Sequence, residues 1–117
     1  MKVIVEIEES DLKPTKICGK FLQAALATHF IHDSQVNRVL PYDERVLFVE
    51  VIDGSKCLKP HTRQKARGEL IESEIQKLVP LDGRGITHYR LFFVGGEGGE
   101  QSLGRVGEAV SRFLDGA

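Results

Sequence analysis

One run of eight residues, Arg45 to Ile52, limits the possible folds of this chain more than any other segment. It reads RVLFVEVI and is apolar at nearly every position. A strand with one face in water alternates between apolar and polar residues, so an unbroken apolar run is typical of a strand that is buried on both faces. We therefore expect Arg45–Ile52 to be a central strand of a sheet.

Other segments show the patterns of strands and helices. Alternation with period two and β-branched residues predict a strand over Lys2–Glu8, and similar signals predict a weak strand over Gln35–Leu40 and a strong one over Ile86–Val94. Apolar residues at helical spacing predict helices over about 14–31, 60–79 and 102–115. Pro14 suits a first helical turn, and Pro80 stops the second helix.

The predicted order is strand, helix, strand, strand, helix, strand, followed by an appended C-terminal helix. This order is that of a two-layer, ferredoxin-like α+β fold with a four-stranded antiparallel sheet. In that plan the first and third strands lie in the middle, and these are two strongly apolar strands of the chain. With 117 residues, the chain is expected to form a single domain over 1–117.

In a ferredoxin-like plan both crossover helices cover one face of the sheet and leave the other face open. Strand alternation assigns one set of side chains to that open face. The set is Lys2, Ile4, Glu6, Val46, Phe48, Glu50, Ile52, Ile86, His88, Arg90, Phe92 and Val94. It is too apolar for a solvated face, so Ile4, Phe48 and Phe92 predict an interface, which we expect to join copies of the chain in a homo-oligomer.

Four ionisable residues fall within the same set, namely Glu6, Glu50, His88 and Arg90. Carboxylates, an imidazole and a guanidinium in an apolar setting predict a small-molecule pocket. His88 would be the acid or base, a glutamate would orient it, and Arg90 would bind an anionic group. Two alternatives remain open: the appended helix covers this face, or two copies pair through it. A shift of register by one residue would also separate the four residues.

A basic segment lies between Lys56 and Arg67, with Lys59, Arg63 and Lys65 and no acidic residue among them. Clustered cations can bind the phosphates of nucleic acid or a free phosphate. The segment lacks aromatic residues for base stacking, and a solvated start of a helix is the alternative. Nucleic acid is therefore the least favoured partner.

Metal and cofactor signals are weak. His29 with His32, and Cys57 with His61, have ligand-like spacing, but neither pair has a second pair beside it. The glycine-rich stretch 95–99 fits no phosphate-binding template, and its glutamates would repel phosphate. We predict neither a metal nor a cofactor.

Two smaller features concern individual side chains. Cys18 and Cys57 do not make a disulfide framework, and buried thiols are the favoured interpretation. Gly104, Gly107 and Ser111 share one side of the last helix, where another backbone could approach, within the fold or across a dimer. The alternative is a weak helix that packing stabilises.

The formal net charge of −1 gives no global field for nucleic acid, and no apolar stretch is long enough to span a bilayer. The chain begins without a leader pattern, so we expect a cytoplasmic protein. The favoured function is non-enzymatic binding or assembly as a homo-oligomer, with a small-molecule pocket. Alternatives are a cofactor-free enzyme that uses His88 with Glu6 or Glu50 and Arg90, or phosphate binding through Lys56–Arg67. No residue is assigned as catalytic.

Overall fold

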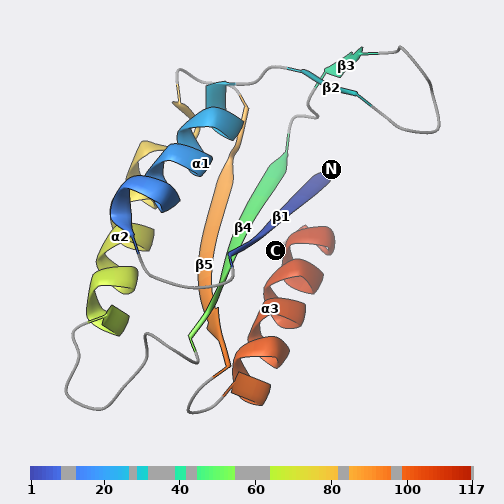
Figure 1. Ribbon diagram of the computed structural model, residues 1–117. Coiled ribbons are helices and arrows are strands. Elements are labelled where there is room, and N and C mark those ends of the chain that lie inside the picture. The colour runs from blue at the N-terminus through green and yellow to red at the C-terminus, as the bar shows by residue number, and fades with distance from the viewer. Residues whose placement is uncertain are drawn as a thin grey trace.

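In the computed structural model, three parallel strands form one sheet, and helices lie against both of its faces (Figure 1). The structure describes residues 1–8, 13–26, 29–31, 39–41, 45–54, 64–81, 85–95 and 99–116. In chain order the elements are β1 (Lys2–Glu8), α1 (Pro14–Leu26), β2 (His29–Ile31), β3 (Val39–Pro41), β4 (Val46–Asp53), α2 (Gln64–Leu78), β5 (His88–Val94) and α3 (Gly99–Leu114).

Strand β4 lies between β1 and β5, as the apolar run predicted. It is parallel to both neighbours, with Ile4 opposite Phe48 on one side and Phe48 opposite Tyr89 on the other. Every side chain from Val46 to Ile52 is buried, including the carboxyl group of Glu50. The prediction of a central strand that is covered on both faces is therefore confirmed.

The ferredoxin-like prediction is wrong. The sheet has three parallel strands in the order β1-β4-β5, and not four antiparallel strands. The weak strand predicted near residue 40 does not join it, because β3 pairs with β2 in a separate two-stranded antiparallel sheet. Each pair of neighbouring strands in the main sheet is connected through a helix, α1 or α2, as parallel neighbours require. The broader α+β class remains compatible with the structure.

Helices α1 and α2 cover one face of the sheet. Helix α1 begins at Pro14 and buries Ile17, Phe21 and Ala25, which recur every four residues along one side. These residues pack with Phe48 of β4 and Tyr89 of β5. Cys18 lies outside this stripe and is exposed, which corrects the prediction of a buried thiol.

Helix α3 covers the other face, where Phe113 packs with Leu47, Val49 and Phe92. The side chains assigned to the open face are divided between the two covered faces: Ile4, Phe48 and their neighbours pack beneath α1, and Phe92 packs beneath α3. The alternative in which the appended helix covers this set therefore applies to Phe92 but not to Ile4 and Phe48. Gly104 and Gly107 are exposed on α3, and a Cβ atom added at either would meet nothing within 4 Å. No backbone in the described part of the chain approaches these glycines.

Helix α2 also protects the outer edge of β5. Gln76 donates from Nε2 to the carbonyl oxygen of Tyr89 at 3.0 Å, and the backbone N–H of Leu91 donates to Glu72 Oε2 at 2.7 Å. Glu72 and Gln76 lie four residues apart, so both reach the same edge from one side of the helix. They occupy backbone groups that another strand would otherwise pair with.

Candidate functional site

The sheet separates the four ionisable residues that were predicted to form one cluster. Glu6 and Glu50 are paired in register, and both belong to the face covered by α1, where Glu6 lies 3.7 Å from Lys20 Nζ. His88 contacts Phe113 of α3, with ring centroids 5.2 Å apart, and therefore lies on the other face. The structure brings together Glu6 with Glu50, and His88 with Arg90, but not the two pairs.

This separation has a simple cause in the register of β5. Tyr89 pairs with Phe48, so the odd-numbered residues of β5 share a face with the even-numbered residues of β4. The predicted cluster combines even-numbered residues of all three strands. A difference of one residue moves His88 and Arg90 to the opposite face, because side chains alternate along a strand.

Glu50 and Tyr89 form a buried polar pair under α1. The Tyr89 hydroxyl donates to Glu50 Oε1 at 2.9 Å, while Glu50 Oε2 has no hydrogen-bond partner in the described part of the chain. Burial raises the pKa of Glu50 to about 7, against the lowering effect of the Tyr89 hydrogen bond. Burial and the nearby Glu50 charge raise the pKa of Tyr89, so its hydroxyl keeps its proton. A ligand has no access to Glu50, since its exposed fraction is 0%.

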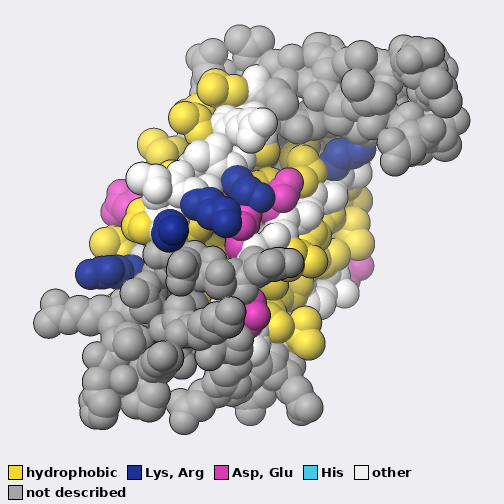
Figure 2. All heavy atoms as spheres, in the orientation of Figure 1, with side chains coloured by type: hydrophobic (Ala, Val, Ile, Leu, Met, Phe, Trp, Pro, Cys, Tyr) yellow, Lys and Arg dark blue, Asp and Glu magenta, His cyan; other side chains and the backbone are white. Residues whose placement is uncertain are grey.

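Glu8 forms a second polar cluster with two lysines of α1, which the sequence analysis did not identify. Its Oε2 lies 3.0 Å from Lys16 Nζ, and its Oε1 pairs with Lys20. Burial alone would raise the pKa of Glu8, but hydrogen bonds from Lys20 and Lys16 outweigh burial and lower it. Figure 2 shows basic and acidic side chains side by side in this part of the surface. The lysine spacing of four residues was the available signal, but only the fold brings Glu8 beneath it.

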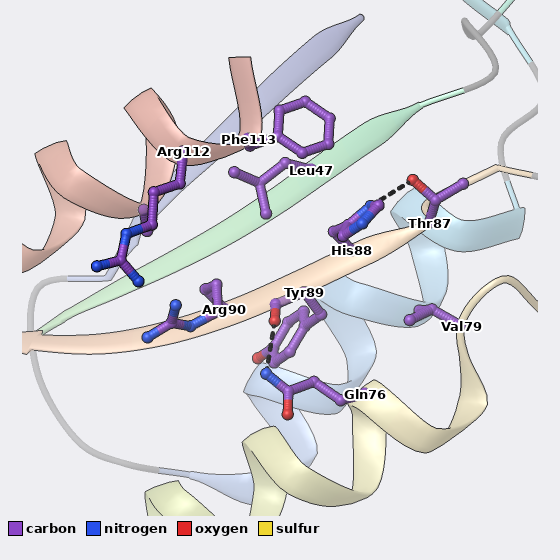
Figure 3. A pocket seen from close by; sticks show the side chains of 10 residues that line it. Leu47, Gln76, Val79, Thr87, His88, Tyr89, Arg90, Arg112 and Phe113 are labelled. Atoms are coloured by element: carbon purple, nitrogen blue, oxygen red, sulfur yellow. Dashed lines mark hydrogen bonds between the residues drawn. The ribbon is translucent and has the colours of Figure 1, made fainter. Parts of the chain in front are cut away.

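A cavity of about 330 Å³ lies along the edge of β5, between α2 and α3 (Figure 3). Its lining residues come from four elements and the segment before β5. They are Leu47, Gln76, Val79, Thr87, His88, Tyr89, Arg90, Ala109, Arg112 and Phe113. Cavities of this size hold small molecules. Of the predicted ligand-binding residues, His88 and Arg90 line this cavity, whereas Glu6 and Glu50 do not.

Two arginines give the cavity its charge. The Arg90 guanidinium lies over the ring of Phe92, 4.8 Å from its centroid, and its Nε is 3.3 Å from Glu72 Oε2. Arg112 extends from α3 towards the same end of the cavity as Arg90 (Figure 3). No carboxylate in the described ranges pairs with Arg112. Arg112 could not be predicted as a site residue from the sequence, because its position depends on how α3 packs across the sheet.

His88 lies at the opposite end of the cavity and contacts Thr87, with Nδ1 2.8 Å from Oγ1. The Thr87 hydroxyl donates to the carbonyl oxygen of Val46 and accepts from the N–H of Val46, at 3.1 and 3.0 Å. Because a hydroxyl has one proton, this network assigns the donor role to His88 Nδ1 and leaves Nε2 as an acceptor. Burial, and then the charge of Arg45, lower the pKa of His88, so the ring is neutral at neutral pH.

The residues of the predicted interface are not available to a partner. Phe48 has an exposed fraction of 0% and packs beneath α1, Ile4 packs against the same core, and Phe92 is buried beneath α3. The chain's own helices cover all three, because the sheet has helices on both faces. The predicted open face is therefore corrected.

Several other predicted features lie outside the described residues. They include Lys56, Lys59, Arg63, Cys57 and His61, as well as His32 and most of the glycine-rich stretch. Lys65 and Arg67 are exposed on α2. Among the described residues, no group of three or more His, Cys, Asp or Glu side chains is arranged to hold a metal ion. No described helix is both long enough and apolar enough to cross a membrane.

The fold and the cavity together define an α+β chain with a ligand-sized cavity at one edge of a parallel sheet. No family model, curated protein or solved structure matches this chain.

Proposed function

We propose that this protein binds a small organic anion with an apolar body in the cavity between α2 and α3. The observation that carries the proposal is the pair of arginines, Arg90 and Arg112, at one end of a cavity that is otherwise largely apolar. The guanidinium group is always charged, and its planar set of donors matches a carboxylate or a phosphate.

The charge balance around the cavity favours an anion. Glu72 contacts the Arg90 guanidinium at Nε, at 3.3 Å. Arg45 lies near the other end, with its guanidinium 4.6 Å from the centroid of the Phe113 ring. His88 is neutral and does not change this charge balance. Arg90 and Arg112 would therefore attract an anionic group. None of the described residues that line the cavity is a carboxylate that could compete with this group for the arginines.

The walls of the cavity favour a ligand with an apolar body. Leu47, Val79, Ala109 and Phe113 line it, and Phe113 offers an aromatic ring. An acceptor at His88 Nε2 would suit a hydroxyl or N–H group on the ligand. Aromatic or short aliphatic carboxylates fit this combination of features.

Binding of benzoate, followed by NMR chemical shifts of the labelled protein, tests the proposal. We expect benzoate to shift the resonances of residues that line the cavity and benzamide, its neutral counterpart, to leave them unchanged. Replacing Arg112 by alanine removes a charged hydrogen bond worth about 1.5–3 kcal/mol, which weakens binding roughly ten-fold to one-hundred-fold.

Arg105→Ala is the matched control, since Arg105 is also an exposed arginine of α3 but does not line the cavity. It should bind benzoate as the unmodified chain does. Equal binding of benzoate and benzamide, or a loss of affinity that is the same in both arginine variants, would refute an anion site.

No observation favours the other two functions over this one. A cofactor-free enzyme would need a carboxylate to orient His88, whereas Thr87 contacts its Nδ1 and Glu50 lies on the other face of the sheet. Most of the basic segment Lys56–Arg67 lies outside the described residues. Assembly into a homo-oligomer remains a prediction, but its interface has to differ from the buried Phe48 and Phe92.

A further inference from the structure

The two edges of the main sheet differ in whether other parts of the chain bond to their outward backbone groups. At the β5 edge, Glu72 and Gln76 occupy backbone groups of Leu91 and Tyr89. At the β1 edge, the N–H of Lys2 donates to the carbonyl oxygen of Arg45, so even-numbered residues of β1 direct their backbone groups towards β4. The backbone groups of Val3, Val5 and Ile7 therefore point outwards, and we call these three residues the β1 edge.

No hydrogen bond to the outward groups of the β1 edge is found within the described part of the chain. Its side chains are also exposed, at 47% for Val5 and 71% for Ile7. Val3 packs against the core beneath α3, whereas Val5 and Ile7 are exposed. Figure 2 shows hydrophobic side chains at the surface beside β1 and α3. An exposed apolar edge strand is a template for pairing with another strand.

The sequence of β1, KVIVEIE, is complementary to itself when two copies run antiparallel. If Val5 of one copy lies opposite Val5 of the other, Val3 lies opposite Ile7 and Lys2 lies opposite Glu8. The three apolar pairs then share one face, where cross-strand pairs of this kind are stabilising. On the other face Ile4 lies opposite Glu6, and Glu8 is buried and already pairs with Lys16 and Lys20 of its own chain, so we expect no ion pair between Glu8 and Lys2 of the other copy.

The backbone directions fit the same register. In an antiparallel pair, residues whose N–H and C=O groups both point to the partner lie opposite one another. With Val5 opposite Val5, all the outward-pointing residues of one copy face outward-pointing residues of the other. A shift of two residues that sets Glu6 opposite Glu6 would put like charges together. The opposite shift would set Ile7 opposite Met1 instead of the β-branched Val3 and would leave Glu8 outside the paired strands.

From this geometry we propose that two copies of the chain pair through antiparallel β1 strands, so that their two sheets become one continuous sheet. The two-fold symmetry of this arrangement closes after two copies, because each β1 edge is used by the other. The β5 edges at the two outer ends stay protected by α2. This pairing does not depend on the cavity, which lies at the β5 edge.

Molar mass measured by sedimentation over a range of concentrations tests the pairing. We expect twice the chain mass of 13.0 kDa. Val5→Lys introduces two ammonium groups opposite each other at the centre of the paired strands, and should move the midpoint of dissociation to at least ten-fold higher concentration. Leu22→Lys is the control, since Leu22 of α1 has the same exposed fraction, 47%, as Val5.

A second measurement identifies the register without any substitution. In a mixed sample of labelled and unlabelled chains, the proposal requires an intermolecular NOE between the Hα atoms of Ile4 and Glu6. A chain that stays at 13.0 kDa at NMR concentrations would overturn the proposal. So would a dimer that lacks this NOE, or one that responds equally to Val5→Lys and Leu22→Lys.

Discussion

At the level of single residues, Glu50 shows how the sheet turns a charged residue into a buried acid. It occupies the centre of β4 with an exposed fraction of 0%, and its one described hydrogen bond comes from Tyr89. Burial raises its pKa to about 7, from 4.5 in an exposed position. The carboxyl group therefore keeps a proton in the folded protein at pH values where the unfolded chain has released it.

This difference makes the stability of the fold depend on pH. Between about pH 4.5 and pH 7 the folded state holds more protons than the unfolded state, so the free energy of unfolding falls as the pH rises. The full loss, reached above pH 7, is roughly 3 kcal/mol. Glu50→Gln removes this titration, so urea unfolding at pH 5 and pH 8 should give more similar free energies than in the unmodified chain.

Glu6→Gln is the control for this prediction, because Glu6 lies beside Glu50 but its side chain is 44% exposed. It should keep most of the pH dependence. The lowered pKa of Glu8 acts in a different window, since the stability that Glu8 provides is lost on acidification below its ordinary pKa of 4.5. An unchanged difference between pH 5 and pH 8 in the Glu50 variant would contradict the assignment.

At the level of elements, helix α2 approaches β5 closely because residue 68 is glycine. A Cβ atom added there would lie 2.5 Å from Cε2 and 2.6 Å from Cζ of the Phe93 ring. This contact lets Glu72 and Gln76, further along the helix, reach the backbone of β5. The glycine pair on α3, Gly104 and Gly107, has no such neighbours and serves no contact in the described structure.

Alanine substitutions should therefore have opposite effects on the two helices. Gly68→Ala forces a clash with Phe93, which we expect to lower the free energy of unfolding by about 1–3 kcal/mol. Gly107→Ala meets open space and improves helix propensity, which should raise it by roughly 0.5–1 kcal/mol. Chemical denaturation of both variants checks this prediction. If both substitutions change the free energy of unfolding in the same direction, one of the two packing environments is misassigned.

At the level of the whole molecule, α3 makes the difference between a two-layer and a three-layer arrangement. It packs across Leu47, Val49 and Phe92, and it contributes Ala109, Arg112 and Phe113 to the cavity. Its main anchor is Phe113, which is 4% exposed. The proposed ligand site therefore exists only when α3 is bound to the sheet.

Phe113→Ala should weaken this layer and the cavity together. Loss of a buried phenylalanine side chain costs about 3–5 kcal/mol, so the midpoint of thermal unfolding should fall well below that of the unmodified chain. Leu114→Ala, at a side chain that is 49% exposed, is the neighbouring control and should have a small effect. If both variants unfold at the same temperature, α3 does not contribute to the stability of the core as described.

The sequence by itself determined the central position of β4, since an unbroken apolar run has no solvated face. Helical spacing in the sequence also puts Ile17, Phe21 and Ala25 on one side of α1, and these three are buried. Cys18 and Leu22 belong to the same apolar pattern but are exposed. His88 and Arg90 were correctly kept together, since residues two apart on a strand share a face.

Only the tertiary structure decided how the strands combine. Alternation assigns the side chains of each strand to two faces. It does not show which face of one strand lies on the same side of the sheet as a given face of the neighbouring strand. The pairing of Phe48 with Tyr89 places His88 on the face of the sheet that is opposite to the face of Glu50. The packing of α3 places Arg112 in the same cavity as Arg90. These relations depend on contacts between distant segments, and local patterns carry no information on them because each pattern records only the neighbours of a residue along the chain.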